Sequence, residues 1–80
     1  MYNAAKVITV SQTFYEYAEC PTGSTATFTF TDMTAELKAG DCDSLVSINT
    51  GDTHTCDDKR IYLKFVANAS GTPARTIAIA

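Results

Sequence analysis

The residues best able to do chemistry in this sequence are three cysteines and a single histidine. Cys42, His54 and Cys56 are ligand types that suit tetrahedral zinc, and Cys20 could complete such a set. No two of the cysteines stand as close together as the paired cysteines of a zinc knuckle. We therefore predict no metal site and no cofactor, and Cys42, His54 and Cys56 are the residues that a zinc site would have to use.

The same cysteines can instead form a disulfide. One bridge among three cysteines leaves one free thiol and allows three pairings. Cys42 and Cys56 both lie in polar, acid-rich segments typical of neighbouring loops, so we predict a disulfide between Cys42 and Cys56. The alternative is three reduced cysteines, the usual state of cysteines in the cytosol.

Nucleophilic catalysis would need a cysteine within hydrogen-bond reach of His54 and a third group to orient the imidazole. The sequence contains no nucleophile elbow and no oxyanion loop. A chain of 80 residues also needs most of its apolar side chains for packing, which leaves little room for a deep pocket. These observations predict a protein that is not an enzyme.

Acidic side chains in the expected loops raise the question of calcium, a cation that prefers oxygen ligands. The Asp41-x-Asp43 pair lacks the glycine and the distal glutamate of an EF-hand, and acidic loops are commonly just solvated. Calcium binding stays open on the sequence alone. The aspartates concerned are Asp41, Asp43, Asp52, Asp57 and Asp58.

Tyrosines are the remaining candidates for a binding role. Tyr15, Tyr17 and Tyr62 fall at positions expected to point outward from strands, where they can anchor a protein partner or stack on a sugar. Cross-strand packing on a half-exposed sheet face would use the same residues without any ligand.

Composition and charge narrow the class of protein. The chain is predicted to form one domain, residues 1–80, because it is too short for two cores. Six basic residues against nine acidic ones give a net charge of −3, so no basic stripe is present for nucleic acid. The first ten residues have neither the basic end nor the apolar run of an export signal, and we expect no membrane insertion.

Threonine-rich alternating segments dominate the chain and predict β-strands, because Cβ branching favours extended backbone. Residues 26–31 alternate phenylalanine with threonine, the period of a half-buried antiparallel strand. Further strands are expected over residues 6–10, 14–17, 44–49, 60–66 and 76–80, with a hairpin partner near 53–56. Only Met33–Lys38 has the helix propensity to form a helix, and we expect one turn at most there. The expected core is Ile8, Val10, Phe28, Phe30, Val46, Ile48, Ile61, Leu63, Phe65, Ile77 and Ile79.

Two segments resemble bacterial immunoglobulin-like domains of the BACON type. The run Phe65–Ile79 is similar to the end of those domains, with a strand, an asparagine-containing turn, an arginine and a final alternating strand. Gly23–Thr29 is similar to their early glycine-serine segment, and Cys20–Ser24 looks like short cysteine modules of Bacteroidetes surface proteins. The resemblance implies an immunoglobulin-like sandwich in a Bacteroidetes or phage setting, with a role in adhesion or display.

These observations together predict an all-β protein, a small antiparallel immunoglobulin-like β-sandwich of six or seven strands. The expected function is a non-enzymatic structural or display module that makes protein–protein contacts. It would serve as a phage virion decoration or fibre protein, or as a bacterial surface assembly module, and a homo-oligomer is one form of such an assembly. The location expected is a virion or the extracellular cell surface. The alternatives are a carbohydrate-binding module that uses Tyr15, Tyr17 and Tyr62, and a metal or redox protein that uses the cysteines.

Overall fold

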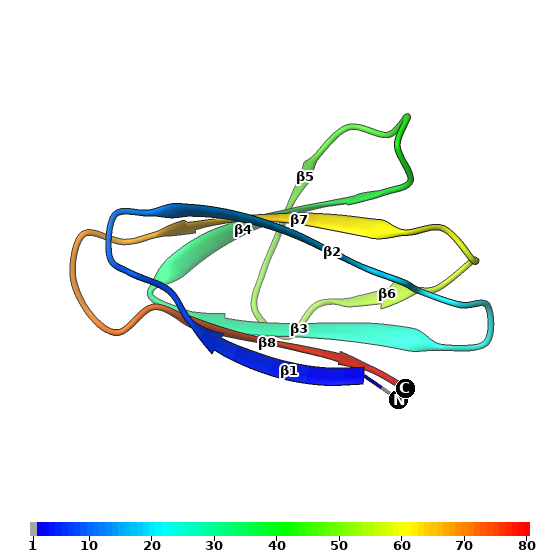
Figure 1. The fold of residues 1–80 in the computed structure, drawn as a ribbon, viewed down its shortest axis with the longest axis horizontal. Helices are drawn as coiled ribbons and strands as arrows, with labels where there is room; N and C mark the ends of the chain where they lie inside the picture. The colour runs from blue at the N-terminus through cyan, green and yellow to red at the C-terminus, as the bar shows by residue number, and fades with distance from the viewer. Residues whose placement is uncertain (1) are drawn as a thin grey trace.

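Eight strands and no helix make up the part of the chain that the structure describes, residues 2–80 of a computed structural model (Figure 1). The all-β class is therefore confirmed, with one or two strands more than expected. The strands are β1 Tyr2–Val7, β2 Thr13–Ala18, β3 Thr25–Thr31, β4 Met33–Ala39, β5 Val46–Ile48, β6 Thr53–Thr55, β7 Ile61–Ala67 and β8 Ala74–Ile79.

The strands form two antiparallel sheets of four, in the orders β1-β8-β3-β6 and β2-β7-β4-β5. Pairs β1–β8, β2–β7, β3–β6 and β4–β5 show that the first half of the chain runs antiparallel to the second half. This long hairpin, rolled into two layers, is the jelly-roll arrangement. In an immunoglobulin domain the first two strands are neighbours in one sheet, whereas β1 and β2 lie in different sheets here. Alternation along a strand does not reveal its neighbours, so the predicted topology was wrong although the two-sheet architecture was right.

The segment expected to form a helical turn is a full strand, β4, between β7 and β5. Its residues have high helix propensity, but Met33 and Ala35 are buried while Thr34 is exposed, which is the period of a strand. Pairing with β7 along the whole length of β4 outweighs the local preference.

The core lies between the two sheets and is built mainly by β3, β7 and β8. Phe28, Leu63 and Ile77 are almost fully buried, as expected. Four expected core residues are not buried: Phe30 and Ile48 are only partly covered, Val10 is 38% exposed and Val46 is 64% exposed. Val10 follows the end of β1, and Val46 lies on the edge strand β5, which rises away from the body in Figure 1. The expected residues found buried are Ile8, Phe28, Ile61, Leu63, Phe65, Ile77 and Ile79.

One ion pair lies inside this sandwich and links its two sheets. Arg75 on β8 is only 6% exposed, and its Nε and Nη2 each donate a hydrogen bond of 2.5 Å to the carboxylate of Glu16 on β2. Its Nη1 donates to the carbonyl oxygen of Ala4 on β1 at 2.8 Å. A buried charge is tolerated only when its hydrogen bonds are satisfied, and here the guanidinium has a partner in each sheet.

No helix long and apolar enough to cross a membrane is present among residues 2–80.

Candidate functional site

The three tyrosines singled out from the sequence lie together on the outer surface of the β2-β7-β4-β5 sheet. Tyr17 on β2 is directly opposite Tyr62 on β7, and Tyr15 is two residues before Tyr17 on the same side of the strand. Tyr15 is 67% exposed and Tyr17 is 58% exposed. We call the surface formed by Tyr15, Tyr17 and Tyr62 the tyrosine face.

Two cations lie over the rings of this face. The guanidinium carbon of Arg60 is 4.3 Å from the centre of the Tyr17 ring, and Lys38 Nζ is 5.0 Å from the centre of the Tyr62 ring. The two rings are 6.3 Å apart at an interplanar angle of 51°, so they form no flat platform. Cation–π attraction holds each charged group against its ring and limits the motion of both.

Two carboxylates at the end of the face hold Arg60 and Tyr62 in place: Glu19 binds the guanidinium, and Asp41 binds the phenol hydroxyl. Arg60 Nε donates a hydrogen bond of 2.9 Å to Glu19 Oε1, and Nη2 lies 2.8 Å from the same oxygen in an ion pair. The hydrogen bond to Glu19 is the main cause that raises the pKa of Arg60 above its ordinary value. The Tyr62 hydroxyl donates a hydrogen bond to Asp41, and this bond raises the pKa of Tyr62 above 10.0 because it stabilises the protonated phenol.

An open groove of about 540 Å³, here called the end groove, borders the tyrosine face. Both signs of charge meet in it, because it includes the Arg60–Glu19 ion pair and several aspartates. A groove with aromatic, cationic and acidic walls suits a polar, shaped partner better than an apolar ligand. The groove is lined by Glu19, Ala39, Gly40, Asp41, Cys42, Asp43, Asp58, Lys59, Arg60 and Tyr62.

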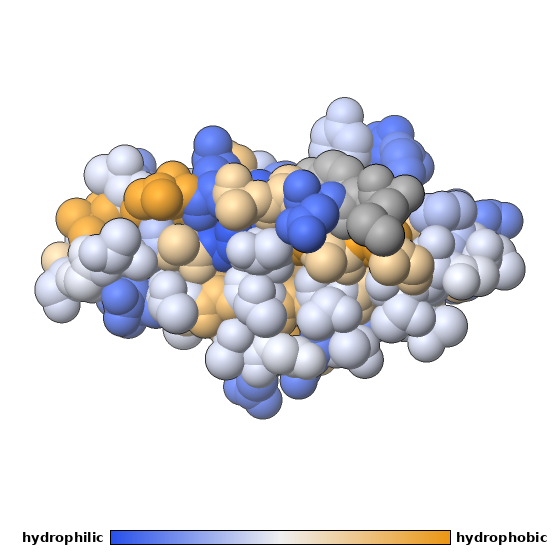
Figure 2. All heavy atoms as spheres, turned by 90° about the horizontal axis from the view of Figure 1, so that it is seen from below, coloured by the Kyte–Doolittle hydropathy of each residue, from blue (hydrophilic) through white to orange (hydrophobic). Residues whose placement is uncertain are grey.

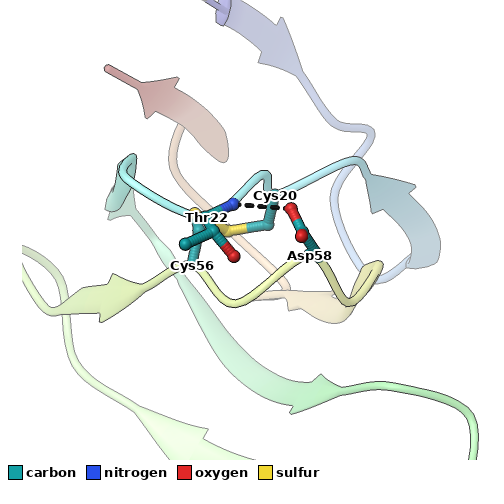
Figure 3. Close-up of a disulfide and its surroundings, with 4 residues drawn as sticks. All are labelled: Cys20, Thr22, Cys56 and Asp58. Atoms are coloured by element: carbon teal, nitrogen blue, oxygen red, sulfur yellow. Dashed lines mark hydrogen bonds between the residues drawn. A yellow bond between two sulfur atoms is a disulfide. The ribbon is translucent and has the colours of Figure 1, made fainter.

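A buried disulfide joins the two chain segments that carry the Arg60–Glu19 pair. It connects Cys20 to Cys56, with the Cα atoms 4.9 Å apart, so the predicted Cys42–Cys56 bridge was wrong. Figure 3 shows the bridge beside the hydrogen bond that Thr22 N donates to Asp58 Oδ1, at 2.8 Å. A second bond, from Asp58 N to the Cys20 carbonyl oxygen at 3.0 Å, completes a tight loop.

Strand pairing explains this choice of partner. Antiparallel β3 and β6 place Thr25 opposite Thr55, so the residue after β6 meets the segment before β3. The backbone bond from Cys56 N to the Ser24 carbonyl oxygen, at 3.0 Å, shows that contact. Cys42 is instead an exposed free thiol in the loop after β4.

The structure does not assemble the metal-site candidates. Cys56 is committed to the disulfide, Cys42 is exposed, and His54 on β6 faces inward with the fully buried Ala26 opposite it. Among residues 2–80, no three histidine, cysteine or acidic side chains are placed to share a metal ion.

The loop aspartates, considered above as calcium ligands, mostly accept hydrogen bonds from the protein itself. Asp52 accepts one from the backbone N–H of Asn49, Asp58 accepts one from Thr22, and Asp41 accepts the tyrosine hydroxyl.

Sequence reasoning found the tyrosines but missed the residues that hold them. Arg60, Glu19, Lys38 and Asp41 come from four separate segments, and their roles depend on the β2–β7–β4 register. The sequence did contain one signal for Arg60: it stands just before an alternating strand, and a long basic side chain there can contact a side chain on the neighbouring strand.

Comparison of the chain with protein-family models, with curated proteins and with solved structures finds no match.

Proposed function

We propose that this chain is a non-enzymatic display module that binds a protein partner through the tyrosine face and the end groove. The observation that carries the proposal is the grouping of two exposed tyrosines, the half-buried Tyr62 and a stacked arginine on one sheet face. Tyrosine and arginine are the residues that most often dominate the binding energy of protein interfaces.

Rigidity supports the same proposal. Tyr17 and Tyr62 lie on paired strands, and the Cys20–Cys56 disulfide ties together the segments that present Arg60 and Glu19. Side chains that are already held in place lose little conformational entropy when a partner binds. A preformed face of this kind suits a module that must hold a partner firmly rather than adapt to it.

A glycan is the less favoured ligand. Sugar rings stack on bare aromatic faces, whereas Arg60 and Lys38 already lie over Tyr17 and Tyr62. Tyr15, at 67% exposure, is the tyrosine on which a glycan-binding role would depend.

Two features speak against catalysis by the cysteine–histidine pair. Cys56 is in a disulfide, so it has no thiolate to attack a substrate. His54 points into the sandwich, while the free Cys42 lies in an exposed loop.

We place the module on a virion or an extracellular cell surface. The buried disulfide suits a compartment or particle exposed to oxidising conditions. Jelly-roll sandwiches occur in viral capsids and in lectins, and this likeness is an analogy of fold only.

The experiment uses the biotinylated chain against virions and cell envelopes of the organism that encodes it. The wild type is compared with Tyr17→Ser, with Tyr15→Ser, and with Thr29→Ser on the opposite sheet as a control. We expect retention that falls at least about tenfold in Tyr17→Ser and is unchanged in the control, since a central anchor costs about 2 kcal/mol or more.

Retention that survives both tyrosine changes, or no retention on any particle, would overturn the proposal. Retention that free oligosaccharides abolish, and that depends on Tyr15 rather than Tyr17, would assign the glycan-binding role instead.

A further inference from the structure

The outer surface of the β1-β8-β3-β6 sheet differs sharply from the tyrosine face. Antiparallel register places the outward side chains of its four strands in regular rows of threonine and alanine. Within residues 3–79, none of these outward positions is charged. We call this surface the threonine face, and it consists of Asn3, Ala5, Val7, Thr25, Thr27, Thr29, Thr31, Thr53, Thr55, Ala74, Thr76 and Ala78.

Figure 2 views the molecule from this side: pale and light-tan side chains cover much of the face, and strongly hydrophilic blue groups lie along its upper part in this view. The other sheet shows that charge is tolerated at outward strand positions in this protein. Glu36 lies opposite Lys64 there, and Lys38 is two residues further along β4. Loss of charge is a recognised mark of the centre of protein interfaces.

We propose that the threonine face is the contact surface between two copies of this chain. A second copy presents the same strand spacing and mostly short side chains, so no long or charged side chain stands between the two faces. Two twisted sheets pack face to face at about 30°, as the two layers of a β-sandwich do. This contact is separate from the tyrosine face and leaves that face open on both copies.

Charge supports a second copy as the occupant. Each chain has a net charge of −3, so identical chains repel one another overall. An uncharged contact adds no like-charge pair to that repulsion and places the charged sheets on the two outer sides of the dimer.

The area sets the strength of the contact. Three of the four strands have six or seven residues and are roughly 20 Å long, whereas β6 has only three residues, so the footprint is roughly 350 Å² per copy. The pair would bury roughly 700 Å², which is below the range of stable specific complexes and suits a transient contact. The association is therefore weak in dilute solution and grows where display on a particle holds copies close together.

Sedimentation velocity over a wide range of protein concentration tests the proposal. We expect the weight-average mass to rise toward that of a dimer with concentration. Thr29→Lys should weaken this association at least about tenfold, because it places two positive charges in an uncharged contact. Thr34→Lys is the matched control, because it makes the same change at an exposed outward position of β4 and should behave as the wild type.

The salt dependence of the association distinguishes the threonine face from the tyrosine face. Association through the threonine face should strengthen as salt screens the net charge of −3, whereas association through the charged tyrosine face should weaken. A chain that stays monomeric at every concentration would overturn the proposal. So would an association that weakens in salt, or one that Thr29→Lys leaves intact.

Discussion

The buried ion pair between Arg75 and Glu16 gives the sharpest test of how this fold is held together. Arg75→Met removes the guanidinium and leaves the Glu16 carboxylate, whose side chain is only 12% exposed, without its two hydrogen-bond donors. Breaking one partner of a buried pair costs about 3–5 kcal/mol. A domain of 80 residues has a free energy of unfolding of roughly 4–12 kcal/mol, so this one change removes about a quarter of it or more.

The matched control is the exposed pair of the same residue types. Arg60 and Glu19 have side chains that are 45% and 69% exposed, so solvent screens the pair and Arg60→Met should destabilise the protein much less than Arg75→Met. The double variant Arg75→Met with Glu16→Met leaves no unpaired charge and should be within about 1 kcal/mol of the wild type. The double variant therefore should be more stable than the Arg75→Met single variant.

Urea unfolding of the oxidised protein measures these differences. Far-ultraviolet circular dichroism and tyrosine fluorescence are suitable probes, because the chain contains no tryptophan. A cost below about 1 kcal/mol for Arg75→Met would show that the pair is not held as described. The single variant Glu16→Met completes the set. If the double variant loses as much stability as Arg75→Met and Glu16→Met lose in sum, the two residues act independently.

Three further predictions follow from single contacts. Cys56→Ser opens a bridge between residues separated by 36 positions and should cost about 4 kcal/mol in urea unfolding. Equal stability of the oxidised and the reduced wild-type chain would contradict this. Tyr62 should ionise with a midpoint above pH 10.0 in an ultraviolet absorbance titration, and Asp41→Asn should lower that midpoint. Because folding raises the pKa of Tyr62, the hydrogen bond to Asp41 stabilises the fold fully below pH 10.0, and this stabilisation is lost as the pH rises through the pKa of the folded state. Equal Tyr62 midpoints before and after Asp41→Asn would contradict the prediction. Gly71→Ala would bring a Cβ within 2.5 Å of an Asp32 carboxylate oxygen, whereas Gly23→Ala meets nothing within 4 Å at a similar positive φ. Gly71→Ala should therefore be the less stable of the two by about 1–3 kcal/mol, and equal melting temperatures would refute the clash.

Strand-level features were predictable because they follow from side-chain alternation within a short segment. Phe28, Leu63 and Ile77 were placed in the core for that reason and are buried there. Val46 alternates in the same way but lies on an edge strand, where its exposure depends on whether another strand covers it. Burial at an edge is a tertiary property, and alternation alone does not contain it.

Pairing across the chain was the part that the sequence did not reveal. Cys56 is linked to Cys20 because β3 and β6 are neighbours, and Arg75 meets Glu16 because β8 lies near β2 across the sandwich. Both contacts join residues far apart in sequence, so no local pattern marks them. The tyrosine face was partly accessible, since outward strand positions give exposure but not the cations that cover the rings.

The position of β8 has a consequence for how the protein is made. The last strand of the chain lies between β1 and β3, and its register joins Tyr2 to Ile79. Residues 74–79 must emerge from the ribosome before this sheet can close, so until then β1 and β3 each have an unpaired strand edge. Closure of such a distant pair is slow compared with local folding, and the waiting chain is open to aggregation. Expression of this protein should therefore depend more on chaperone supply and on the rate of synthesis than its small size suggests.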